Sequence, residues 1–387
     1  MRKIYLVMML MAGIMSLTAC GKTAETAVAT ECACKNCKCC TCNKDEEQSG
    51  IKVENAEDIF SQEKESEEAS ESVEIPQTEV STIPETESEA VTEEETITET
   101  EPEGQQPPVE KNVSELTDGE RAARKQLQIN FASTREQFYA LPNSLSKTQK
   151  INEMDKQILA NNSFDFSTKT VQFLGDSITE AICGAVNEEG DFISYVDYAN
   201  DYLKFNMCMN NGKAGRMFSD YGGSELSFSL DMGSMYNNSA DISVIFLGVN
   251  DYLTGKENKR YGDMNATEST AGYIGSVRYA LKQLKSNYPN QDIFFVTMYD
   301  IAKTSNSTYS DVAGSPQLED YMEVLRTLVE ESGYHLIELY DIGFMDCNDA
   351  TTRDIYTADG LHPNDNGNRI LGEHIAAELS IYYSQRQ

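Results

Sequence analysis

A serine stands where an apolar run ends and an amphipathic segment begins. In VQFLGDSITEAI, residues 171–182, Ser177 follows the run 171–174 and precedes apolar residues spaced three and four apart. Serine and aspartate are preferred helix N-caps, so Ser177 could close a strand-to-helix turn. The same hydroxyl is a nucleophile if the chain also supplies a base, an orienting acid and donors for an oxyanion. The stretch alone does not separate the two roles.

The elements around this serine follow an alternating pattern of strand and helix. Polar residues at the ends of such strands share one edge of a sheet, where α/β proteins bind their ligands, and Ser177, Gly215 and Asn250 follow the first three expected strands. The pattern predicts a three-layer α/β domain with a five-stranded parallel sheet. The expected strands are 171–174, 205–209, 242–247, 293–298 and 336–340, and the clearest helices are 274–288, 315–332 with Ser315 as cap, Pro316 at its first position and Gly333 past its end, and 365–382.

Four short motifs resemble the blocks of the SGNH hydrolases, also called GDSL-type esterases and lipases. They are GDSIT at 175–179, KAGR around Gly215, GVND at 248–251 and DGLHPN at 359–364, in the order that the family shows. The resemblance covers the chain from about residue 170 to the C-terminus. It implies a flavodoxin-like SGNH fold and a serine hydrolase that needs no cofactor.

The resemblance also assigns roles to individual residues. It makes Ser177 the nucleophile, His362 the general base and Asp359 the acid that orients the imidazole. The oxyanion hole would consist of the backbone N–H groups of Ser177 and Gly215 and the side-chain amide of Asn250. These residue types suit acyl transfer, because a neutral hydroxyl attacks well only when a base of near-neutral pKa takes its proton.

Several neighbours have a structural explanation instead. Asp176 and Asp251 are expected to brace turns, and His335 and His374 to be packed or solvated rather than catalytic. Gly212 is a rival for the glycine of the second block, although Gly215, followed by arginine, resembles the carbohydrate-esterase members more closely. The scattered Cys183, Cys208 and Cys347 are expected to behave as small apolar residues.

The N-terminus has the layout of an export signal. Arg2 and Lys3 precede an apolar run that ends in Leu-Thr-Ala-Cys, which resembles the lipobox of bacterial lipoproteins. The resemblance implies cleavage after residue 19, lipid on Cys20, and a protein that is anchored to the cell membrane and faces away from the cytoplasm. Two or more acyl chains hold a protein stably on a membrane.

A long acidic segment separates this anchor from the rest. Residues 45–110 hold 23 acidic residues against Lys52 and Lys64, about 21 of the 33 net negative charges. Such a segment cannot bury enough apolar surface to fold, and its charge argues against nucleic acid as a partner. We therefore divide the chain into a signal (1–19), a disordered tether (20–111), a helical extension (112–165) and a hydrolase domain (166–387).

The tether begins with a dense cysteine cluster. Its spacing suits thiolate binding of a soft metal such as Cu(I) or Zn(II), while local disulfides or no function at all are equally available. The six residues are Cys32, Cys34, Cys37, Cys39, Cys40 and Cys42.

Composition also bears on the substrate. The loops at 252–261 and 302–315 are polar and contain tyrosine, and no long apolar run is present to line an acyl tunnel. We expect removal of acetyl groups from an extracellular carbohydrate. The alternatives are a lysophospholipase or thioesterase of the same family and, from another class, an inactive tethered protein that binds or sequesters metal.

Overall fold

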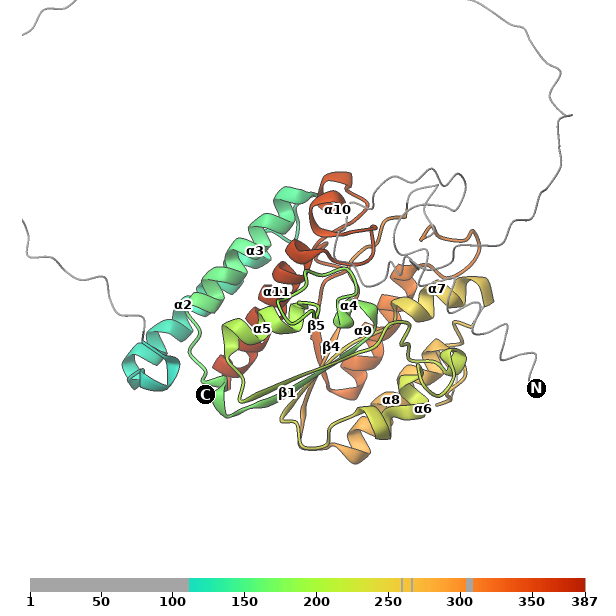
Figure 1. Ribbon diagram of the computed structural model, residues 1–387, viewed down its shortest axis with the longest axis horizontal. Helices are drawn as coiled ribbons and strands as arrows, with labels where there is room; N and C mark the ends of the chain where they lie inside the picture. Colours follow the sequence, from blue (N-terminus) through green and yellow to red (C-terminus); the bar gives the residue numbers. More distant parts are fainter. Residues whose placement is uncertain (1–110, 259, 266, 304–308, 387) are drawn as a thin grey trace, which may run out of the picture. The chain divides into compact units, whose positions relative to one another are not determined.

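Five parallel strands form the centre of the computed structural model, which describes residues 111–387 except 259, 266, 304–308 and 387 (Figure 1). The strand order is β2-β1-β3-β4-β5, which is the flavodoxin-like order expected from the sequence. The strands are β1 (Thr170–Gly175), β2 (Met207–Gly212), β3 (Ile242–Phe246), β4 (Asp292–Val296) and β5 (His335–Ile337). Cys20, the cysteine cluster and nearly all of the tether lie outside the described residues.

Burial explains which strands the sequence located well. All five residues of β3 are buried, as its unbroken apolar run predicts for a strand covered on both faces. The edge strand β2 is only partly buried and begins at Met207, two residues later than expected. Its alignment with β1 brings Gly212 opposite Gly175, so the two strands end at the same level.

Two groups of helices cover the sheet (Figure 1). α5 and α11 pack against each other on one side, and α6, α8 and α9 form a second packed group on the other. The remaining helices are shorter or lie outside these layers. The bounds are α2 (Asp118–Glu136), α3 (Leu145–Ala160), α4 (Ser177–Glu180), α5 (Tyr195–Leu203), α6 (Phe228–Met235), α7 (Val249–Asn258), α8 (Tyr273–Asn287), α9 (Leu318–Ser332), α10 (Ala350–Tyr356) and α11 (Asp365–Gln385).

α2 and α3 form the expected helical extension, and both pack on α11. The contact between them is polar as well as apolar. Asp155 of α3 bonds Arg135 of α2 at 2.5 Å and His374 of α11 at 2.8 Å, and Arg135 also contacts Glu378. Asp155 is fully buried, and the ring of Phe344 stacks on His374. We call Arg135, Asp155, His374 and Glu378 the α11 charge cluster.

Two helix starts differ from the sequence expectation. α9 begins at Leu318 with Gln317 as its N-cap, so Ser315 is not the cap and Pro316 is not in the first turn, because Gln317 and Asp320 form the reciprocal pair of hydrogen bonds that closes the helix start. Gly333 does end α9, with φ of 75°. None of the described helices is long and apolar enough to cross a lipid bilayer.

Candidate active site

Ser177 is the first residue of a four-residue helix, α4, directly after β1. The N-cap is Asp176, whose Oδ1 accepts a hydrogen bond from the Ile178 amide at 2.9 Å. Ser177 is therefore not the cap, and its hydroxyl is left for other contacts. The longer amphipathic helix expected here is wrong, because Ala181 takes a left-handed conformation (φ 59°) and ends α4 after one turn.

The Ser177 hydroxyl meets an imidazole and, beyond it, a carboxylate. Ser177 Oγ lies 2.9 Å from His362 Nε2, and His362 Nδ1 lies 2.8 Å from Asp359 Oδ2. Ser177 and His362 are 185 residues apart in sequence. All three side chains are buried to within a few per cent, so the contacts are shielded from water. The order hydroxyl, imidazole, carboxylate permits proton transfer from serine to a ring that the carboxylate stabilises.

The loop between α10 and α11 holds both Asp359 and His362. Asp359 Oδ1 accepts hydrogen bonds from the backbone amides of Leu361 (2.9 Å) and His362 (2.7 Å), so the loop folds around the carboxylate. Asn364 then caps α11 through the Gly367 amide. Burial alone would raise the pKa of Asp359, but the hydrogen bonds and charge of His362 hold it below its ordinary value. Asp359 is thus a carboxylate at neutral pH.

Three N–H donors are expected to form the oxyanion hole. Among the described residues, the backbone amides of Ser177 and Gly215 donate to no protein group. Gly215 has φ of 80°, a conformation that favours glycine. Asn250, in the first turn of α7, donates through Nδ2 to the Arg216 carbonyl at 3.0 Å and to Asp176 Oδ2 at 3.4 Å, so an oxyanion would take the proton of the longer bond. The rival Gly212 ends β2 and packs against the backbone of Thr179 and Glu180, so its lack of a side chain serves packing.

Two further side chains fix the loop that carries Gly215. The Arg216 guanidinium donates to the carbonyls at the ends of β1 and β2, Gly175 and Asn211. Asp251 accepts from the amides of Phe218 at 2.7 Å and Ser219 at 3.0 Å. The sequence suggested Asp251 as a brace, and these bonds confirm it; Arg216 was not singled out, because its partners are backbone atoms that no residue pattern reveals.

The site also buries two carboxyl groups without a matching cation in direct contact. Burial raises the pKa of Asp176 to about 7, although the Ile178 amide and the charges of His362 and Arg216 act the other way. Burial likewise raises the pKa of Asp251 to about 6. Asp176 Oδ2 is 3.4 Å from Asn250 Nδ2, which ties this cap to the amide donor.

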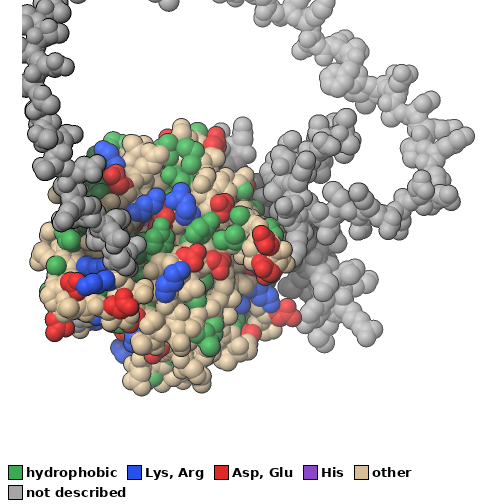
Figure 2. Space-filling view, turned by 60° about the vertical axis from the view of Figure 1, so that its left-hand side comes forward, with side chains coloured by type: hydrophobic (Ala, Val, Ile, Leu, Met, Phe, Trp, Pro, Cys, Tyr) green, Lys and Arg blue, Asp and Glu red, His purple; other side chains and the backbone are tan. Residues whose placement is uncertain are grey.

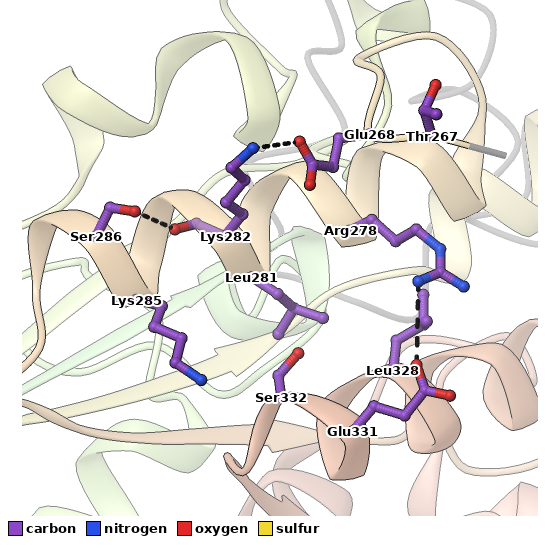
Figure 3. Close-up of a pocket in the computed structure, with 10 residues that line it drawn as sticks. All are labelled: Thr267, Glu268, Arg278, Leu281, Lys282, Lys285, Ser286, Leu328, Glu331 and Ser332. Atoms are coloured by element: carbon purple, nitrogen blue, oxygen red, sulfur yellow. Dashed lines mark hydrogen bonds and ion pairs between the residues drawn. The ribbon is translucent and has the colours of Figure 1, made fainter.

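The other sequence candidates take no part. His335 at the start of β5 contacts Tyr382, and His374 belongs to the α11 charge cluster. Cys347 is buried, whereas Cys183 and Cys208 are only half-buried, and none of the three forms a disulfide with another described residue. A recess of about 560 Å³ between α8 and α9 contains none of the candidate residues, and four of the charged groups that line it form the pairs Lys282–Glu268 and Arg278–Glu331 (Figure 3). Within the described ranges, no three potential metal ligands cluster.

Residues 173–370, just over half of the chain, match the GDSL-like lipase/acylhydrolase family. The chain belongs to this family. A GDSL-like acylhydrolase is a carboxylic ester hydrolase, so the resemblance drawn from the four motifs is confirmed at the level of family and enzyme class.

Several solved structures are similar to this GDSL-like protein. A protein from Lactobacillus plantarum is 23% identical, with a TM-score of 0.47 over 55% of this chain and 97% of its own. A possible lipase from Chitinophaga pinensis is 18% identical (0.43; 55% and 97%), and an acetylxylan esterase from Geobacillus stearothermophilus is 16% identical (0.38; 56% and 96%). At such identities the likeness concerns the fold alone. No curated protein matches the chain.

Proposed function

We propose that this hydrolase removes O-acetyl groups from a carbohydrate by a serine mechanism. Ser177 Oγ attacks the acetyl carbonyl carbon while His362 Nε2 takes the hydroxyl proton. His362 then gives that proton to the leaving sugar oxygen, and water, deprotonated by His362, releases acetate from the acyl-enzyme. The observation that carries this proposal is the row of contacts from Ser177 Oγ through His362 to Asp359, at 2.9 and 2.8 Å.

The negative charge of the tetrahedral intermediate needs donors that are already in place. The candidates are the backbone amides of Ser177 and Gly215 and the Asn250 Nδ2 proton that now makes the longer bond, to Asp176 Oδ2. Contacts with the Arg216 carbonyl and with Asp176 hold the Asn250 amide, and Asp251 holds the loop after Gly215. Preorganised donors of this kind lower the barrier because they need no reorientation as charge develops.

The chemistry of the surrounding loops supports a small acyl group. Tyr252 is buried, with its hydroxyl bonded to Asp311 at 2.6 Å, and the Tyr261 hydroxyl binds the Asp320 carbonyl, so neither ring is a free sugar platform. Tyr221, 39% exposed in the loop after β2, is stacked under Arg260 and offers an aromatic surface instead. A lysophospholipase or thioesterase, which needs an apolar channel, fits these polar loops less well.

Two further parts of the proposal concern the N-terminal region. We propose that lipid on Cys20 anchors the enzyme to the outer side of the cell membrane and that residues 20–111 tether it. The alternative of an inactive metal-binding protein would rest on the cluster from Cys32 to Cys42 and on an idle hydrolase site.

Substitution of the serine tests the mechanism. Ser177→Ala should lower kcat on 4-nitrophenyl acetate by about 10⁶-fold, the scale for losing a triad nucleophile. Asn250→Ala should cost on the order of 10²–10³ in kcat, the scale for one oxyanion donor. Released acetate from acetylated polysaccharides, measured for wild type and Ser177→Ala, would identify the substrate. A folded Ser177→Ala protein with most of its activity would contradict the assignment.

A further inference from the structure

The hydroxyl of Tyr309 reaches the carboxylate that holds His362. Tyr309 lies between β4 and α9, and its Oη donates to Asp359 Oδ2 at 3.1 Å. Asp359 Oδ2 also accepts the His362 Nδ1 proton at 2.8 Å, while Asp359 Oδ1 accepts hydrogen bonds from two backbone amides of its own loop. Of these four donors, Tyr309 alone comes from outside residues 359–362.

Tyr309 is held in place from the oxyanion side of the site. Tyr252 follows Asn250 by two residues on α7, and its hydroxyl contacts both the Tyr309 carbonyl (3.2 Å) and Asp311 Oδ1 (2.6 Å). Lys303 lies 3.8 Å from Asp311 and 2.9 Å from Asp300, which secures the other side of the same segment. Hydrogen bonds therefore lead from the helix of Asn250 to the carboxylate of Asp359.

The Tyr309 hydroxyl keeps its proton at neutral pH and so can donate it to Asp359. Burial raises the pKa of Tyr309 well above its ordinary value, and the adjacent carboxylate of Asp359 adds to the effect. A neutral phenol beside an ionised carboxylate gives a charge-assisted hydrogen bond, which is stronger than one between neutral groups. Such a bond both fixes the acceptor oxygen and draws negative charge away from it.

We propose that Tyr309 is a positioning residue that acts through Asp359 to set the basicity of His362. It fixes Oδ2 in line with His362 Nδ1, and by sharing the charge of the carboxylate it limits how strongly the imidazolium is stabilised. This role rests on the proposed triad. No motif of the sequence includes Tyr309, which stands 50 residues before Asp359.

Other ionisable groups face the pair and must remain unchanged in a test. Their positions differ, so none duplicates the bond from Tyr309. They are Asp176 at the start of α4, Tyr299 after β4 with its hydroxyl on the Leu361 carbonyl, Cys347 before α10, Arg353 on α10 and Cys183 near Tyr309.

Histidine titration by NMR tests the proposal on the full chain. The sequence has three histidines, so His362→Asn identifies the His362 ring signal. Tyr309→Phe should raise the pH midpoint of that signal by about 0.5, because losing a donor to the charged carboxylate leaves more charge to stabilise the imidazolium. The acid limb of kcat/KM for 4-nitrophenyl acetate should move by the same amount, with KM unchanged within about twofold.

A matched control is Tyr383→Phe. Tyr383 is buried and, like Tyr309, donates to a carboxylate; its acceptor is Asp292, at the opposite end of β4. It should leave the His362 midpoint unchanged. In an Asp359→Asn background, Tyr309→Phe should no longer move the midpoint, since the hydroxyl acts through the carboxylate.

Three outcomes overturn the proposal: an unchanged or lower midpoint in folded Tyr309→Phe, a rise that persists with Asp359→Asn, or a change confined to KM, which would make Tyr309 a substrate contact. If Tyr309→Phe does not fold, Tyr252→Phe replaces it and should produce a smaller rise. The NMR readout needs no turnover, so it separates this proposal from the triad, which fails if Ser177→Ala stays active.

Discussion

Asp176 joins two roles in one residue. As the N-cap of α4 it aims Ser177, and as a fully buried carboxyl group beside Asn250 it holds a donor of the site. Its burial raises its pKa to about 7 from 3.8. The geometry of the site is therefore maintained at a cost in stability that depends on pH.

Asp176→Asn should reveal that cost. Between about pH 4 and 7 the unfolded chain releases the Asp176 proton while the folded chain keeps it, so the free energy of unfolding of wild type falls as pH rises. Asparagine does not titrate. The free energy of unfolding of Asp176→Asn should therefore rise relative to that of wild type across this interval by on the order of a few kcal/mol, at about 1.4 kcal/mol per pKa unit. Urea unfolding at several pH values measures the difference.

Exposed Asp201 supplies the control. The free energy of unfolding of Asp201→Asn should change with pH in the same way as that of wild type. If the free energies of unfolding of Asp176→Asn and wild type change with pH in parallel, Asp176 has an ordinary pKa in the folded protein.

The residues that the sequence revealed are those whose identity is fixed by local spacing. GDS and DGLH place their side chains through bonds within a few residues, such as the Asp359 carboxylate on the Leu361 and His362 amides. Arg216 and Tyr309 act on partners 41 and 50 residues away, and any donor at the right point in space would serve. Such long-range contacts leave no pattern in a single sequence.

At the scale of helices, α2 and α3 are joined to α11 by the α11 charge cluster. Burial raises the pKa of Asp155, but the charges of His374 and Arg135 more than offset this and hold it below its ordinary value. The stabilisation is present above the ordinary pKa of aspartate and is lost as pH falls through the lowered one.

Asp155→Ala should destabilise the protein by about 3–5 kcal/mol, because it leaves the charge of buried Arg135 with one partner fewer. Asp201→Ala, which removes an exposed pair with Lys204, should change stability by less than about 1 kcal/mol. Thermal and urea unfolding compare the two variants. Equal losses would mean that the α11 charge cluster contributes no more than a surface pair.

The polar loops at 252–261 and 302–315 determine which acyl-chain length we expect the enzyme to prefer. Each buried methylene contributes about 0.8 kcal/mol, so an acyl channel would raise kcat/KM steadily with chain length. The polar loops offer no such burial, so 4-nitrophenyl esters from two to eight acyl carbons should be best at acetyl, with roughly tenfold loss by octanoyl. The assay uses protein that lacks residues 1–111, at ester concentrations below those at which micelles form. A maximum at hexanoyl or longer would favour a lipase.

Strands and helices were predictable from the sequence where burial of apolar side chains decides their position. Unbroken apolar runs located β3 and β4 to within two residues, since both are almost wholly buried. The ends of α4 and α9 were not, because a left-handed Ala181 and a Gln317 cap depend on backbone geometry that apolar spacing does not report. The edge strand β2 was displaced because only half of it is covered.

The whole molecule combines this domain with a long acidic N-terminal region. Basic and acidic side chains alternate on the face of the domain shown in Figure 2, with no broad field of one sign. The acidic excess therefore belongs mainly to residues 45–110, with 23 acidic residues and two lysines. In the proposed arrangement, this acidic region separates the lipid anchor from the active site.

Cys20→Ala should move the protein from the membrane to the soluble fraction without changing kcat/KM on 4-nitrophenyl acetate, because our proposal places the lipid on Cys20 and the active site beyond the tether. Fractionation followed by an esterase assay measures both. Protein that stays in the membrane pellet would show that the apolar segment 4–17 anchors it instead.

The separation of 185 positions between Ser177 and His362 in the sequence also sets the order in which they are synthesised. Ser177 leaves the ribosome early, but Asp359 and His362 emerge only when the last helix, α11, is about to follow. If Ser177 and His362 act as proposed, a nascent or prematurely ended chain carries the nucleophile without its base and should not cleave an ester. Hydrolysis would then start only after residue 362 has been synthesised and the domain has folded.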